Sequence, residues 1–127
     1  MTSARVVICG ASGIDEKHAD WVPLDTGEDP SKGARLAILG GAGGVGVLLV
    51  ELEPGGMIGR HATPEVSVCH VIEGDGTVFL ADGDELPFER GDTLEFAGDL
   101  VHGWRGGRER TLLAVTTYPS SEAGEST

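Results

Sequence analysis

The sequence predicts an all-β domain that closes into a barrel or sandwich of short strands. Glycine accounts for 21 of the 127 residues, about one in six, against an average near 7%. These glycines show no three-residue period and are spread along the chain, as tight turns between short strands require. No apolar segment with a 3.6-residue period reaches three helical turns. Because many short strands in one domain must hide their edges, we expect the sheet to close on itself.

Residues 1–34 are predicted to form an N-terminal arm with extended segments. Val6–Cys9 is predicted to be a short strand, Asp15–Ala19 one helical turn, and Trp21–Leu24 an extended segment that packs an aromatic ring. The stretch TGEDPSKG, residues 26–33, is typical of a turn. The arm carries apolar side chains, and we expect them to lie across a second copy of the chain; they are Val6, Val7, Ile8, Trp21 and Leu24.

Residues 35–118 are predicted to form the barrel as two facing sheets, followed by a disordered polar tail at 119–127. β-branched and apolar runs alternate there with glycine-rich or acidic turns. The expected strands are Arg35–Leu39, Val45–Glu53, Val66–Ile72, Thr77–Leu80, Leu86–Phe88, Thr93–Phe96, Val101–Trp104 and Thr111–Tyr118. The expected turns include 40–44, 54–56, 73–76 and 81–84.

Charge and cysteine content restrict the partners and the compartment. The formal net charge is −12, and a strongly acidic chain repels phosphate backbones and anionic lipid. We therefore expect no nucleic-acid or membrane partner. Two cysteines, Cys9 and Cys69, are too few for a disulfide framework. The apolar runs are too short for a signal peptide or a membrane span, so we expect a cytoplasmic protein with free thiols.

One glycine motif is a false signal for a nucleotide site. Gly41, Gly43 and Gly46 satisfy G-x-G-x-x-G, but phosphate binding by that motif needs a helix directly after it. The residues that follow are VLLVELEPGG, which favour a strand and then a turn.

Two further segments resemble the paired motifs of the cupin superfamily, which consists of small jelly-roll barrels. In residues 54–74, Gly55, His61 and Gly74 fall in register with the first cupin motif. In residues 91–106, Gly91 and His102 fall in register with the second. The resemblance covers about residues 35–118 and implies a double-stranded β-helix barrel, whereas function varies widely within that superfamily.

The resemblance also implies where a metal would bind, and this chain departs from the pattern there. The four ligand positions of metal-binding cupins correspond to His61, Thr63, Ser67 and His102. Hydroxyls are poor ligands for transition metals beside imidazole and carboxylate. Glu65 lies four residues from His61, about 13 Å along an extended chain, and would help only if the chain bends at Pro64. We predict no firm metal site, and at most one divalent transition metal held weakly by His61 and His102.

The remaining side chains near the two histidines are predicted to line a pocket. Thr63, Ser67 and Cys69 share strand parity with His61, and Trp104 shares it with His102. Small residues at former ligand positions either avoid overpacking or widen a cavity for an organic ligand. Trp104 would be an aromatic wall or a core residue. His70 has the opposite parity and is expected to face away.

Three functions remain open from the sequence. The first is an enzyme in which His61 and His102 act as acid and base on a small carbonyl compound, by isomerisation, dehydration or cyclisation. The second is a dioxygenase or lyase that depends on Fe(II), Mn(II), Ni(II) or Zn(II) held by His61, His102 and water. The third is a barrel that only binds a small molecule. We favour the first, and we expect a homodimer because a two-fold pairing hides sheet edges.

Overall fold

The computed structural model describes residues 3–25 and 29–120, and these residues form strands, turns and connecting segments without any helix. This confirms the all-β prediction. The strands in chain order are β1 (Ser3–Gly10), β2 (Gly13–Asp20), β3 (Val22–Pro23), β4 (Lys32–Ala42), β5 (Val45–His61), β6 (Val66–Glu73), β7 (Asp75–Leu80), β8 (Glu85–Glu89), β9 (Thr93–Phe96), β10 (His102–Gly106) and β11 (Thr111–Tyr118). Residues 121–127, most of the tail that we expected to be disordered, lie outside the described part of the chain.

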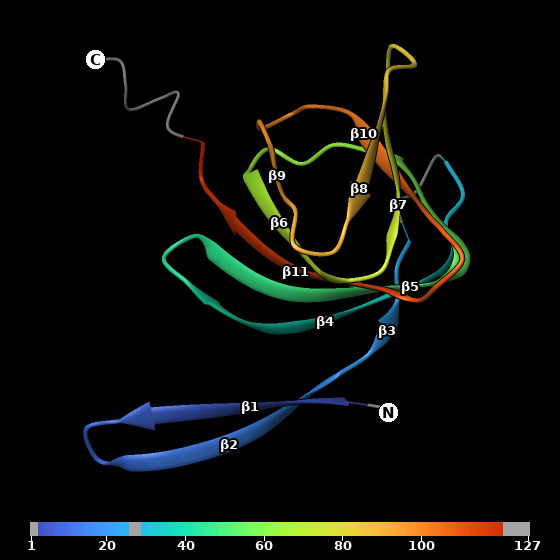
Figure 1. Ribbon diagram of the computed structural model, residues 1–127. Helices are drawn as coiled ribbons and strands as arrows, with labels where there is room; N and C mark the ends of the chain where they lie inside the picture. The colour runs from blue at the N-terminus through green and yellow to red at the C-terminus, as the bar shows by residue number, and fades with distance from the viewer. Residues whose placement is uncertain (1–2, 26–28, 121–127) are drawn as a thin grey trace.

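A nine-stranded antiparallel sheet curls round to form the barrel (Figure 1). Its strands run in the order β8-β7-β10-β5-β11-β6-β9, with β4 on β5 and β3 on β4. The two facing sheets that we expected are halves of a single curled sheet. One continuous sheet supplies both faces, and the strand that joins them is β5.

Strand β5 is longer than predicted because the segment Pro54–Gly56 bends the strand without ending it. Its first half, residues 46–52, pairs with β11, and its last residues pair with β10. At the bend, Gly55 has a φ of 73° and its backbone N–H donates to the carbonyl of Gly107 at 2.9 Å. The bend thus passes the chain from one face of the barrel to the other and delivers His61 to the end of β5.

The arm contains a hairpin in place of the expected helical turn. Strands β1 and β2 pair from Ser3↔Asp20 to Gly10↔Gly13 and form a sheet of their own, seen below the barrel in Figure 1. The prediction of a helical turn at Asp15–Ala19 is wrong because pairing with β1 satisfies the backbone of the whole segment. Local preference is weak over five residues, and strand pairing overrides it.

The end of the arm packs on its own barrel. Arg35 lies 4.7 Å from the ring centroid of Trp21, and Leu24 packs against the core cluster. Trp21 and Leu24 thus contact their own barrel, and the association of the arm with a second copy stays a prediction. In the barrel, strand β4 begins at Lys32 and not at the predicted Arg35. The turn that joins it to β5 consists of Gly43 and Gly44.

The core fills the space between the two halves of the curled sheet. Leu52, Val71 and Leu113 are fully buried there, and each is expected to contribute about 1.5–3 kcal/mol by burial. The framework glycine Gly74 sits beside this core with a φ of 93°, and a Cβ there would lie 2.5 Å from the Thr111 hydroxyl. Both the turn and the close approach require glycine at this position.

Among the described residues, no helix is long and apolar enough to cross a membrane.

Candidate functional site

His61 and His102 are direct neighbours across two paired strands. They form a registered pair of the β5–β10 ladder, and their ring centroids lie 4.7 Å apart with the planes tilted by 54°. The sequence placed them in two motifs 41 residues apart, and the curl of the sheet brings those motifs together.

Backbone carbonyls fix the tautomer of both rings. The Nδ1–H of His61 donates to the carbonyl of Gly59 at 2.9 Å, and the Nδ1–H of His102 donates to the carbonyl of Leu100 at 3.0 Å. A carbonyl oxygen only accepts, so Nδ1 must carry the hydrogen in each ring. In the neutral rings Nε2 is then the free basic atom.

The strand end that carries His61 is held from outside the barrel. The backbone N–H of Gly59 donates to Ser31 Oγ at 2.8 Å, and the N–H of Arg60 donates to Asp29 Oδ2 at 3.2 Å. These bonds fix the Gly59 carbonyl, which in turn orients the His61 ring.

The turn before His102 adopts a conformation that its residue type disfavours. Asp99 has a φ of 65°, in the left-handed region that favours glycine. Its backbone N–H donates to the carbonyl of Thr63 at 2.6 Å. This bond ties the loop before β10 to the loop after β5, so both histidine-bearing segments are joined beside the site.

The two histidines line a cavity of about 370 Å³ inside the barrel. Ten of its sixteen lining residues are apolar and come from both halves of the sheet. The polar lining residues are Asp25, His61, Thr63, Ser67, His102 and Thr117. Such a mainly apolar hollow with a few polar groups is typical of a small-molecule site, at the small end of the usual ~300–1,000 Å³.

All four residues predicted to line a pocket do line this cavity: Thr63, Ser67, Cys69 and Trp104. Trp104 is also a core residue, 3% exposed, with its ring edge-on to Phe88 and Phe96. The Thr63 hydroxyl donates weakly to the carbonyl of Glu65 at 3.4 Å. The wall and core interpretations of Trp104 therefore both apply.

Two other polar residues considered from the sequence lie outside the cavity. His70 is exposed, and its Nδ1 lies 2.9 Å from the hydroxyl of Thr93. Glu65 is not among the lining residues, so the bend at Pro64 does not bring its carboxylate to the histidines.

Burial sets the proton affinity of two groups in the site. Burial lowers the pKa of His102 below its usual 6.5; the bond to Leu100 partly opposes this, and the neighbouring His61 adds to it. His102 is therefore neutral at pH 7. Burial also raises the pKa of the Cys69 thiol to about 12, which excludes it as a nucleophile at neutral pH.

The sequence analysis missed three contributors to the site. Phe96 stacks on His102, the apolar wall includes Leu24 from the arm, and Asp25 adds a carboxylate. The sequence could have predicted part of this wall. Leu36, Leu48 and Val50 lie on the same face of two paired strands, β4 and β5. Nothing in the sequence indicated that the arm would reach the cavity.

The donor set does not fit a firmly held metal ion. No group of three or more His, Cys, Asp or Glu side chains converges within residues 3–25 and 29–120. Beside the two imidazoles stand the hydroxyls of Thr63 and Ser67, which are weak donors for transition metals. We therefore derive no reaction step through a metal, and a weakly held ion stays a prediction.

A larger hollow of about 660 Å³ lies on the outer surface, lined by Trp21 and by a charged cluster. Glu51 is 7% exposed and accepts hydrogen bonds from both Arg35 and Arg110. Burial alone would raise the pKa of Glu51, but the two guanidiniums outweigh it and hold that pKa below 4.5. Arg35 on β4, Glu51 on β5 and Arg110 directly before β11 thus form a charge-compensated cluster that holds these three segments together.

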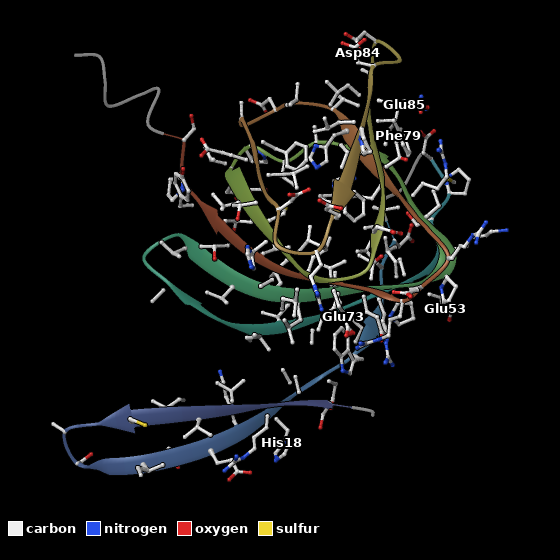
Figure 2. The ribbon with its side chains drawn as sticks, in the orientation of Figure 1. His18, Glu53, Glu73, Phe79, Asp84 and Glu85 are labelled. Carbon is white, nitrogen blue, oxygen red and sulfur yellow. The ribbon has the colours of Figure 1, made fainter. Side chains whose placement is uncertain are left out.

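Figure 2 labels titratable residues that are not among those lining the cavity. His18 lies on the β1–β2 hairpin, and Asp84 and Glu85 lie at the exposed β7–β8 turn.

A curled double-stranded β-helix with a histidine from each motif at its mouth defines the cupin class. Consistent with this, the sequence model of the cupin domain matches residues 48–117. The chain belongs to the cupin domain family.

Solved structures show the same fold at low sequence identity. A cupin-2 domain protein of Rhodospirillum rubrum, Rru_A2000, is 14% identical over 79% of this chain and 69% of its own, with a TM-score of 0.67. The polyketide cyclase RemF of Streptomyces resistomycificus is 20% identical over 73% and 70%, with a TM-score of 0.63. KdgF of a Halomonas species is 15% identical over 82% and 90%, with a TM-score of 0.63. None of the curated proteins matches the sequence.

Proposed function

We propose that this cupin is an acid–base enzyme that moves protons on a small carbonyl compound bound in the barrel. The observation that carries the proposal is the pair of imidazoles 4.7 Å apart, each with Nδ1 bound to a carbonyl. The product would be an isomer, a dehydrated compound or a ring-closed compound.

The pair is suited to hold one proton. Two positive charges at this distance repel each other, so one proton on the pair is favoured over two. His102 is buried and neutral, whereas His61 is partly exposed. In the proposed step, Nε2 of His102 removes a proton from the carbon next to the carbonyl. Protonated His61 donates its Nε2 proton to the carbonyl oxygen, which gives a neutral enol.

The proton then returns in the second half of the reaction. As the carbonyl re-forms, His61 takes back the proton of the enol hydroxyl. Protonated His102 donates its proton to a different carbon for isomerisation or to a leaving hydroxyl for dehydration. For cyclisation, the enol carbon attacks a second carbonyl and His102 donates its proton to the new alkoxide oxygen. Similarity to a polyketide cyclase, with its 20% identity, agrees with the last outcome.

Proton exchange into a simple ketone tests the proposal. The wild-type protein is expected to accelerate deuterium incorporation next to the carbonyl of β-tetralone in D2O, followed by NMR. His102→Ala should reduce that acceleration by about 10²–10⁴, the usual contribution of one acid or base. His70→Ala is the matched control, because His70 is exposed outside the cavity. Exchange that is undiminished in a His61→Ala, His102→Ala variant, or no faster than in buffer for wild type, would contradict the proposal.

We also propose that two copies associate, with the arm of each on strand β4 of the other. Residues 36–50 (LAILGGAGGVGVLLV) carry no charged or polar side chain, although the chain has a net charge of −12. Ile38, Val45 and Val47 are exposed within that stretch, and Val7, Ile8 and Ile14 are exposed on the hairpin. Repulsion between two acidic copies opposes their association, so a stretch without charged side chains is the part of the surface best suited to contact. In Figure 1, the tip of the β1–β2 hairpin and the turn between β4 and β5 lie on the same side of the molecule.

A further inference from the structure

The barrel cavity has a charge pattern that restricts its ligand. Neither Lys nor Arg is among the residues that line it, and its one formally charged side chain is the carboxylate of Asp25. The residues outside the described ranges include no Lys or Arg either. A ligand carboxylate or phosphate would therefore find no cation to pair with.

The nearest guanidinium in the sequence is engaged elsewhere. Arg60 precedes His61, and successive side chains of a strand point to opposite faces. Its guanidinium lies 3.5 Å from the carboxylate of Asp29 and 5.0 Å from the ring centroid of Phe79. Moving Arg60 into the cavity would break both contacts.

The two histidines do not replace the missing cation. His102 is 5% exposed and stacked on Phe96, a setting that disfavours a positive charge on its ring. His61 shares the cavity with the carboxylate of Asp25, so an anionic ligand would meet a negative charge there as well. An anionic group would therefore lose its hydration without gaining a full ion pair, which is costly in a mainly apolar space.

The wall favours an apolar molecule. Trp104 contributes part of an aromatic ring, and most of the other lining groups are aliphatic side chains from both halves of the sheet. The hydroxyls of Thr63, Ser67 and Thr117 can bond neutral oxygen atoms.

We infer that the cavity selects an uncharged, largely apolar ketone or phenol of about two rings and excludes carboxylates and phosphates of the same size. This inference rests on the proposed function for the site, but it concerns which ligand binds and not how protons move.

Matched ligands of one skeleton test this inference by calorimetry at about pH 7.5, where a carboxyl is ionised and a phenol is not. β-Tetralone and β-naphthol are expected to bind the wild-type protein at least about tenfold more tightly than β-naphthoate, because only the carboxylate must be desolvated as an ion. Equal or tighter binding of β-naphthoate would overturn the inference. Failure of both uncharged probes to bind at millimolar concentration would also overturn it.

A positive charge introduced at the cavity provides a second test of the inference. Thr117 lines the cavity and is partly exposed, so Thr117→Lys can place an ammonium group there. This variant is expected to gain at least about tenfold in affinity for β-naphthoate, whereas Thr117→Met, of similar size and no charge, should not. A Thr117→Lys protein that binds β-tetralone but still excludes β-naphthoate would contradict the argument.

The same measurements on the His61→Ala, His102→Ala variant separate the two proposals. The preference for uncharged probes is expected to persist there, because the apolar wall and Asp25 remain. If the preference holds while proton exchange proves independent of the histidines, the proposed function fails and the ligand class stands. If exchange depends on the histidines but the uncharged probes are not preferred, the proposed function stands and the inferred ligand class fails.

Discussion

The ring of Phe96 lies flat against the ring of His102, with the centroids 3.9 Å apart and the planes within 7° of parallel. Phe96 is 5% exposed and itself packs edge-on to Trp104. One face of the imidazole is therefore shielded from water, which contributes to the burial that disfavours its charged form. The stack leaves Nε2 as the polar atom available to a ligand.

The buried His102 is expected to make the protein less stable in mild acid. Its pKa is below 6.5 in the folded state, so below about pH 6.5 the unfolded chain binds a proton that the folded chain does not. The free energy of unfolding should therefore be at its full value above that pH and fall as the pH decreases toward the lower, folded pKa. His102→Gln should show a shallower fall in urea titrations at several pH values, since other groups contribute equally to both proteins. Identical slopes would contradict the assignment.

The two thiols are expected to differ sharply in reactivity. Cys9 is exposed, whereas Cys69 is 4% exposed with a pKa of about 12. Because the thiolate is the reacting form, iodoacetamide at neutral pH should modify Cys9 and leave Cys69 intact until the protein is unfolded. Mass spectrometry of the native protein should show one adduct, and a Cys9→Ser variant should show none. Rapid labelling of Cys69 in the folded protein would refute this.

Restoring the missing donors is expected to create a metal site. Thr63 and Ser67 line the cavity with the two histidines, so Thr63→His with Ser67→Glu would supply three imidazoles and a carboxylate. Affinity for Mn(II), measured by calorimetry, should rise on the order of a hundredfold over the wild-type protein. Thr63→Val with Ser67→Ala is the matched control and should show no gain. Tight Mn(II) binding by the wild-type protein would contradict our assessment of its donor set.

The presence of a non-glycine residue at position 99 is expected to lower the free energy of unfolding. An L-residue with a φ of 65° is strained, by about 1–2 kcal/mol in the left-handed region. Asp99→Gly should raise the free energy of unfolding by up to about 1 kcal/mol, since glycine also loses more chain entropy on folding. The bond from its backbone N–H to Thr63 does not depend on the side chain. Asp99→Ala should be no more stable than the wild-type protein, and a gain there equal to that of glycine would show that φ is not the cause.

The proposed association of two copies predicts the effect of one charge on strand β4. Beyond Leu36, no described strand pairs with the outer edge of β4, and Ile38 is 64% exposed there. Ile38→Lys should convert a dimer into a monomer in sedimentation experiments, because a lysine on an edge strand prevents pairing. Leu86→Lys, at a similarly exposed residue of β8, should leave the dimer intact. A wild-type protein that is monomeric at micromolar concentration would refute the proposal.

Most of the barrel was predictable because its signals are local. Alternating strands, glycine turns and two spaced motifs all lie within short windows, and they led to the fold and to the meeting of His61 and His102. The helical turn at Asp15–Ala19 was wrong because the pairing of β2 with β1 is a tertiary choice that five residues do not encode. Phe96 could not be assigned to the site, since its stacking depends on how the loop before β10 turns at Asp99. Leu24 and Asp25 reach the cavity through a connection whose path no periodicity reveals.

The β1–β2 hairpin shares no ladder with the barrel, and Ala4 is its one buried residue. A two-stranded hairpin is marginally stable by itself in water. Its amides are therefore expected to open independently of the barrel and to exchange with solvent by local fluctuation, while those of β5 and β11 exchange only on global unfolding. Exchange rates along one chain would then report two separate equilibria. The slower would measure the fold that holds the histidines, and the faster would measure whatever holds the arm in place.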